Sequence, residues 1–223
     1  HAGSAYRRDP TTYNARDAAL GARVRFVGAD SLHLATPNPP THPYWSTTDS
    51  IQVPDVPPPY EKIRICHSVS NRSTKGTNEI VPALIDVQRE LDHEYGYEVE
   101  IQILEHLGFA ECIRQRAGAQ IFVDQLCPEI GGFGASAVEA MAAGCAIIAD
   151  IRNTPTWEGW HKHGVEDPPI IHVADTEDLR SEILHLVGNP GPLETCRQMS
   201  LDWVRQWATP TAMARYFVGK LNE

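Results

Sequence analysis

Strand-like and helix-like segments alternate from Glu61 to the end of the chain, and this alternation constrains the fold more than any other feature. Short apolar runs predict strands, and apolar residues three and four positions apart predict amphipathic helices. We expect strands at 63–66, 99–103, 119–123, 146–149 and 169–173, and helices at 77–91, 109–116, 135–143, 176–187, 192–207 and 210–221. Because such alternation produces βαβ units, the sequence predicts an α/β fold with a parallel sheet and helices on both faces.

Residues 1–60 differ from the rest of the chain because prolines crowd there. Proline lacks a backbone N–H and fixes φ, so it disfavours long helices and central strands. We expect only a short helix at 12–20 and a short strand at 24–27, and no well-packed independent domain. The sequence therefore divides into two parts. We expect residues 1–60 to be the end of a larger domain plus a proline-rich linker, and residues 61–223 to form a regular domain.

The charge balance and the cysteines argue against several classes of protein. The formal net charge is -10, and bulk charge of that sign repels nucleic acid. No apolar run approaches the roughly 20 residues of a transmembrane helix. The five cysteines are an odd number without a CxxC motif, so we expect reduced, mostly buried thiols in a cytoplasmic protein. No metal site is expected, because His161, His163 and His172 have no cysteines at zinc-ligand spacing.

Three residues or pairs mark helix boundaries. Gly144 suits the position just after a helix end. Thr209 followed by Pro210 suits a helix start, since threonine caps the first turn and proline has the φ of the first helical position. The acids at 175–178 also lie at a helix start, where we expect them to cap N–H groups rather than bind a metal.

The loop at 67–77 leads from the first strand into a helix that Thr77 is able to cap, and it carries cations and hydroxyl groups. A helix N-terminus presents free N–H groups and a positive dipole end, so this turn suits a phosphate. Lys75 would supply a compact charge, Arg72 a bidentate fork and Ser70 a hydroxyl. We expect a local basic pocket, since the segment 61–76 has a single acid, Glu61, and four cations: Lys62, Arg64, Arg72 and Lys75. The alternative is an ordinary solvated turn, and no P-loop motif occurs.

A second glycine-rich loop follows the strand at 119–123 and leads into the helix that contains Glu139. Glycines before a helix let the backbone approach a ligand closely. Glu139 lies too deep in the helix to cap it, and its apolar surroundings make an unpartnered carboxylate costly to bury. A ribose diol would supply two hydroxyl donors to this carboxylate. The alternative is a salt bridge to a neighbouring Arg or Lys.

These two segments, HSVSNRSTKGT and DQLCPEIGGFGASAVEAMAAGCAII, together resemble the C-terminal domain of GT-B glycosyltransferases of the family 4 type. The resemblance covers residues 61–150. It implies a Rossmann-like fold that forms the C-terminal, nucleotide-sugar-binding half of a GT-B enzyme. Residues 1–60 then resemble the remnant of an N-terminal domain and the interdomain linker, and a missing N-terminal acceptor-binding domain would precede His1.

Carried over by position, the resemblance assigns a donor site. Arg72 and Lys75 would hold the diphosphate, and Glu139 would bind the ribose hydroxyls. The backbone N–H groups that would face the phosphate or the sugar are those of Gly132, Phe133, Gly134 and Ala135. Glu105, after the second strand, is a candidate for contacting the base. One position departs from the family pattern, which has a glutamate where this chain has Gly131, and Glu129 is the candidate substitute.

The resemblance implies transfer of a hexosyl or related group from a nucleoside diphosphate sugar to an acceptor. It implies retention of configuration and no metal or other cofactor, with the isolated fragment inactive. Two alternatives are a non-catalytic nucleotide-sugar-binding module and a GT-B-type epimerase or phosphorylase.

Overall fold

The structure is a computed structural model that describes residues 8–28, 35, 41–45, 48, 51–152 and 157–222. Its largest element is a five-stranded sheet in which all strands run parallel. In spatial order the strands are β4 (Val99–Glu105), β3 (Ile63–Val69), β5 (Ile121–Val123), β6 (Ala146–Ala149) and β7 (Ile170–His172). The predicted parallel sheet is confirmed, and the strands expected at 63–66 and 119–123 lie in its interior.

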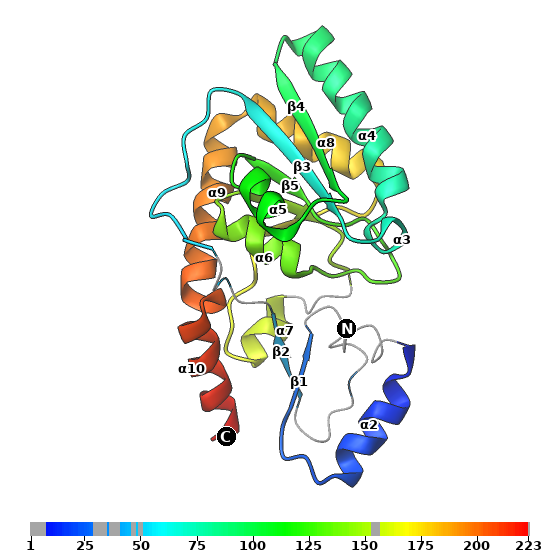
Figure 1. Cartoon of the computed structure of the whole chain (residues 1–223), viewed down its shortest axis with the longest axis vertical. Helices are drawn as coiled ribbons and strands as arrows, with labels where there is room; N and C mark the ends of the chain where they lie inside the picture. The colour runs from blue at the N-terminus through cyan, green and yellow to red at the C-terminus, as the bar shows by residue number, and fades with distance from the viewer. Residues whose placement is uncertain are drawn as a thin grey trace.

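Helices cover both faces of the sheet because side chains alternate along each strand. On β5, Ile121 packs into one apolar layer and Phe122 into the other. The helices are α4 (Thr77–Glu90) and α8 (Thr176–Gly188) in the first layer, α5 (Phe109–Arg116) and α6 (Ala135–Ala142) in the second, and α9 (Pro190–Trp203) reaching both. In Figure 1, α5 and α6 lie in front of the sheet and α8 runs behind it. The predicted helices on both faces are confirmed.

The predicted helix boundaries are confirmed where a glycine follows the end of a helix or a capping side chain precedes its first turn. Gly144 follows the end of α6 with φ +80°, in the left-handed region that glycine adopts without strain. Asp175 accepts hydrogen bonds from two N–H groups in the first turn of α8. Thr209 accepts one in the first turn of α10 (Pro210–Leu221) at 3.2 Å. These caps satisfy N–H groups that otherwise have no intrahelical acceptor.

The N-terminal region holds a short helix and a second, two-stranded sheet. The helix α2 (Pro10–Ala19) and the strand β1 (Arg25–Gly28) correspond to the predicted short helix and strand. A further strand, β2 (Thr41–Tyr44), pairs in parallel with β1 and is not predicted, because it contains Pro43. A strand in a two-stranded sheet has a free edge, and at an edge the missing N–H of a proline is tolerated.

Several short elements also differ from the prediction. They are α3 (Arg72–Lys75), α7 (Trp157–Lys162) and two π-helical turns, η2 (Leu91–Tyr95) after α4 and η3 (Val204–Ala208) after α9. Thr77 does not cap α4, because its hydroxyl lies 2.9 Å from Nε2 of His67 and the N-terminus of that helix has no side-chain cap. Asn71 instead caps α3, where its side chain accepts bonds from two N–H groups of the first turn.

Candidate functional site

The loops that follow β3 and β5 meet at one edge of the sheet. β4, the next strand in sequence, lies on one side of β3, and β5 lies on the other side. The chain therefore changes its direction of progress across the sheet between β3 and β5. In open parallel sheets, ligands bind at the carboxyl ends of the strands beside such a switch point. Figure 1 shows α3 and α6, which follow these strands, at the edge of the sheet nearest to α7 and the β1–β2 pair.

The two loops contact each other through their backbones. The N–H of Leu126 donates a 3.0 Å hydrogen bond to the carbonyl of Lys75. Between α3 and α4, Gly76 has φ +65°, and a Cβ at this residue would lie 2.7 Å from the carbonyl carbon of Leu126. A glycine is therefore required both by the backbone conformation and by the close approach of the second loop.

Lys75 is buried at this junction and forms an ion pair with Asp124, the first residue after β5. Its ammonium also donates to Oγ of Ser136 at 3.1 Å. Asp124 is fully buried and accepts bonds from Oγ of Ser136 at 2.7 Å and from the N–H of Gly134 at 3.1 Å. Burial alone raises the pKa of Asp124, but the Lys75 ammonium and these donors together hold it below its ordinary value.

The N-terminus of α6 lies directly beside this ion pair. A Cβ added to Gly134 would lie 3.8 Å from Nζ of Lys75, so this glycine keeps the space next to the ammonium open. In the part of the chain that the structure describes, no hydrogen bond is recorded from the backbone N–H of Ala135 or Ser136. A cation and the free N–H groups of a helix N-terminus thus occur together, which is the arrangement that binds phosphate.

Glu139, on the second turn of α6, is paired with Arg116 at the end of α5. The guanidinium of Arg116 also donates to Oγ of Ser68 at 2.8 Å and lies 5.6 Å from the ring centre of Phe122. Burial raises the pKa of Glu139, and the charge of Arg116 opposes that rise. A salt bridge to an Arg or Lys was the alternative to ribose binding that the sequence left open, and the structure contains it. The ribose-binding role of Glu139 stays a prediction.

Arg72 is exposed on α3 and forms a 3.3 Å ion pair with Glu105 at the end of β4. The structure therefore brings together the residue predicted to bind phosphate and the residue predicted to contact the base. The next residue, His106, has φ +60°, which is strained for a residue other than glycine.

The prediction of a basic pocket within 61–76 is wrong, because the four cations lie apart and each is paired with a carboxylate. Lys62 and Arg64 lie at the opposite, amino end of β3, where they pair with Glu98 at 2.7 Å and Glu100 at 3.1 Å. The pairs follow from the parallel register of β3 and β4, which places Arg64 opposite Glu100. Of these four cations, Arg72 and Lys75 lie at the carboxyl end of β3.

The remaining predicted residues are arranged around the glycine loop or beside it. Ser70 is exposed just after β3. The carbonyl of Gly132 accepts a bond from Nε2 of Gln125. Phe133 is buried, and its ring packs near Trp160 at a centre-to-centre distance of 6.1 Å. Glu129 is exposed and accepts a 3.3 Å bond from Sγ of Cys127, and no recorded contact between described residues joins it to Lys75 or Glu139.

Four residues that the structure places in the site have no role predicted from the sequence. They are Ser68, Arg116, Asp124 and Ser136. Asp124 had a usable signal, because it is an acid directly after an apolar strand that was expected to end at the ligand edge. Arg116 had none, since only the tertiary fold brings the end of α5 to Glu139.

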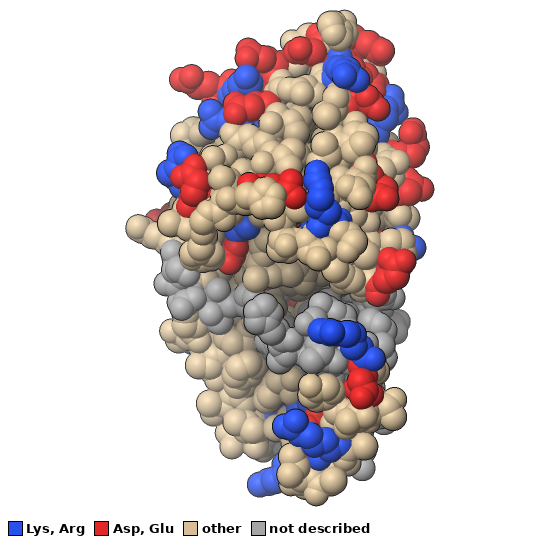
Figure 2. Space-filling model, turned by 45° about the vertical axis from the view of Figure 1, so that its right-hand side comes forward, with Lys and Arg blue, Asp and Glu red and all other residues tan. Residues whose placement is uncertain are grey.

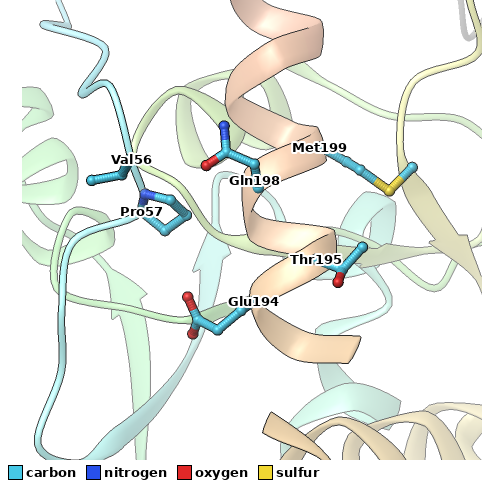
Figure 3. A pocket seen from close by; sticks show the side chains of 6 residues that line it. All are labelled: Val56, Pro57, Glu194, Thr195, Gln198 and Met199. Atoms are coloured by element: carbon cyan, nitrogen blue, oxygen red, sulfur yellow. The ribbon is translucent and has the colours of Figure 1, made fainter. Parts of the chain in front are cut away.

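Charge elsewhere on the molecule is mixed. Figure 2 shows Lys and Arg side chains beside Asp and Glu side chains over the part that carries the five-stranded sheet. A separate hollow of about 540 Å³, shown in Figure 3, is lined by residues before β3 and residues of α9: Val56, Pro57, Glu194, Thr195, Gln198 and Met199. This lining has one acid and no base, so it does not suit a phosphate. Among the described helices, none has both the length and the apolar character to cross a membrane.

Comparison with known proteins supports the fold. No protein-family model and no curated protein sequence matches the chain. The structure is similar to sucrose-phosphate synthase from Thermosynechococcus elongatus, with a TM-score of 0.57 and 16% identity over 89% of this chain and 57% of that chain. The C-terminal domain of a glycosyl transferase group 1 family protein from Francisella tularensis has a TM-score of 0.46 and 21% identity, over 70% of this chain and 89% of that domain.

A third solved structure, the spinosyn forosaminyltransferase, has a TM-score of 0.45 and 12% identity over 96% of this chain and 61% of its own. The likeness to the synthase confirms the predicted Rossmann-like α/β fold, and a glycosyltransferase role stays a prediction. This chain spans little more than half of the length of the synthase. The family 4 type and the donor-binding half remain predictions.

Proposed function

We propose that this chain binds the nucleoside diphosphate of a sugar donor at the switch point and serves as the donor-binding part of a glycosyltransferase. The observation that carries the proposal is the placement of the Lys75 ammonium beside Gly134 at the N-terminus of α6. When the glycosidic bond to the donor breaks, negative charge develops on the departing diphosphate. Lys75, Arg72 and the free N–H groups of α6 would stabilise that charge without a metal ion, through groups that are already oriented.

A calorimetric titration of Lys75→Ala with UDP, GDP and ADP tests this proposal. We expect binding of the preferred nucleotide to weaken by about 1.5–3 kcal/mol, or roughly 10- to 150-fold, as for loss of a charge-assisted hydrogen bond. The loss should shrink for the nucleoside, which has no phosphates. Lys75→Arg should restore little, because a planar fork does not replace a compact ammonium.

The matched control is Lys62→Ala, which removes a lysine from the opposite end of β3. We expect this variant to bind nucleotides as the wild type does. Equal affinity of the wild type and Lys75→Ala for every nucleoside diphosphate would disprove the phosphate site.

Gly131 favours a second candidate function, a nucleotide-sugar-binding module without transfer. The family pattern has a glutamate at this position, whereas Gly131 has no side chain and the nearby Glu129 is exposed and bonded to Cys127. Because the isolated fragment is expected to be inactive in either case, the two candidates are separated by an assay on a longer form of the chain that follows both hydrolysis of the bound nucleotide sugar and transfer to added acceptors. Transfer supports the enzyme, and tight binding without turnover supports the module.

A further inference from the structure

Asp124 is the most enclosed charged group at the switch point, and the proposed binding of phosphate does not use it directly. Its side chain is fully buried, and its partners among the described residues all lie where the loop after β3 meets the N-terminus of α6. They are the ammonium of Lys75, the hydroxyl of Ser136 and the N–H of Gly134. This carboxylate therefore joins the cation of the first loop to the start of α6.

The two residues after Asp124 extend the same connection. Gln125 donates from Nε2 to the carbonyl of Gly132 in the glycine loop. Leu126 donates from its N–H to the carbonyl of Lys75 at 3.0 Å. The segment 124–126 thus holds both the side chain and the backbone of Lys75 in fixed positions relative to α6.

The charges explain why this connection persists when a ligand binds. A fully buried carboxylate is strongly destabilised when its partner leaves, so Lys75 stays with Asp124. An ammonium has three N–H donors, and two of them are used by Asp124 and Ser136. The third donor is the one left for a phosphate oxygen at the N-terminus of α6.

We propose that Asp124 is a positioning residue that fixes the Lys75 ammonium for the donor diphosphate. The inference rests on the proposed nucleotide site. A positioning role and net charge alone predict opposite effects of neutralising Asp124 on nucleotide affinity. Neutralising a carboxylate beside a polyanion site should tighten binding by simple electrostatics, whereas loss of a positioning group should weaken it.

A double-mutant cycle tests the inference by calorimetry with UDP and GDP, using Asp124→Asn, Lys75→Met and the double variant. We expect Asp124→Asn to bind the preferred nucleotide about tenfold more weakly, because the ammonium loses its main acceptor. Since Asp124 acts through Lys75, its loss should not weaken binding further in the Lys75→Met background, so the double variant should bind at least as well as Lys75→Met alone. A role limited to general stability would instead weaken binding in both backgrounds.

Two further variants keep the test valid if Asp124→Asn folds poorly. Asp150→Asn is the matched control, because Asp150 is equally buried, follows the neighbouring strand β6 and pairs with Arg152 at 2.8 Å. We expect it to lose stability and keep its nucleotide affinity. Ser136→Ala removes the second acceptor of Lys75 without creating a buried unpaired charge, so it should weaken binding about threefold, and only when Lys75 is present.

The outcomes separate this inference from the proposed function. Unchanged nucleotide affinity in Lys75→Met would overturn both. Weak binding by Lys75→Met, together with unchanged or tighter binding by Asp124→Asn, would overturn the positioning role and leave the nucleotide site intact. Where Asp124→Asn does not fold, or Lys75→Met is destabilised by the unpaired Asp124, a Ser136→Ala effect that persists in the Lys75→Met/Asp124→Asn background, which has neither charge, would also overturn it.

Discussion

His67, at the middle of β3, has both ring nitrogens engaged although it is fully buried. Its Nδ1 lies 2.9 Å from the carbonyl of Val123, and a carbonyl only accepts, so Nδ1 carries the proton. Its Nε2 then accepts from the hydroxyl of Thr77 at 2.9 Å. The neutral imidazole therefore links β3 to the end of β5 and the start of α4, directly behind the predicted phosphate site.

The first prediction concerns the pH dependence of folding at His67. Burial lowers the pKa of this imidazole, with further lowering by the charges of Lys75 and Arg72, while the Val123 carbonyl and Asp124 act in the opposite sense. A folded-state pKa below the unfolded value of about 6.5 stabilises the fold above that pH. The free energy of unfolding should therefore fall as pH decreases from about 6.5, by up to about 1.4 kcal/mol per pH unit.

Urea unfolding between pH 7.5 and 5.5 measures this effect. His67→Asn should be less stable at pH 7.5 and show a smaller loss of stability on acidification. His93→Asn, which removes an exposed imidazole, should keep the wild-type slope. Identical slopes for the wild type and His67→Asn would contradict the assignment of a neutral, buried His67.

The corner between α3 and α4 is held by the fit of Gly76 against the loop after β5. This fit leads to a prediction about Gly76→Ala. Gly96, which follows η2, has a similar φ of +69° but nothing within 4 Å of an added Cβ. Gly96→Ala should cost only the left-handed backbone penalty of about 1–2 kcal/mol. Gly76→Ala should cost on the order of 2 kcal/mol more, because the backbone of Leu126 must move.

Urea unfolding of both variants, beside nucleotide titration, checks this prediction. Gly76→Ala should also weaken nucleotide binding, because the displaced Leu126 donates to the carbonyl of Lys75. Gly96→Ala should leave that binding unchanged. Equal losses of stability in the two variants would show that the loops do not meet as closely as described.

The elements that sequence predicts here are those with strong local signals. The buried strands and the helices α4 to α6 and α8 to α10 have regular apolar spacing, and their ends carry glycine, proline or capping residues. The short helix α3 has too few residues for periodicity, and Asn71 was its only local signal. The strand β2 was missed because the fold places Pro43 in a two-stranded sheet, which the local sequence does not reveal.

The candidate site was predictable in its loops and not in its pairings. Strand order and chain connection put Lys75 and the glycine loop at one edge, as the motifs indicate. The partners Asp124 for Lys75 and Arg116 for Glu139 come from segments 49 and 23 residues away in sequence. Such pairs depend on the packing of whole elements, so spacing within one motif does not identify them.

An aromatic cluster joins the N-terminal region to the sheet domain. Trp45 is buried, and its ring centre lies 5.5 Å from Trp160, 5.6 Å from Trp203 and 5.4 Å from Tyr216. Its indole N–H donates to the carbonyl of Trp207 at 3.0 Å. The division between 1–60 and 61–223 is therefore crossed by a shared core, and we expect the chain to unfold as one cooperative unit.

The last prediction tests this coupling through Trp45. Trp45→Ala should destabilise the whole chain by about 3–5 kcal/mol, because it removes a large buried side chain and leaves a cavity. Trp45→Phe keeps an aromatic ring but loses the donor to Trp207, so about 1–2 kcal/mol is expected. Leu20→Ala, an exposed change in the same region, should stay within about 0.5 kcal/mol of wild type. Urea unfolding followed by far-ultraviolet circular dichroism, which reports mainly on the sheet domain and its helices, should show a single transition that shifts with Trp45→Ala. If that transition keeps its wild-type midpoint, the N-terminal region is attached to the sheet domain without stabilising it.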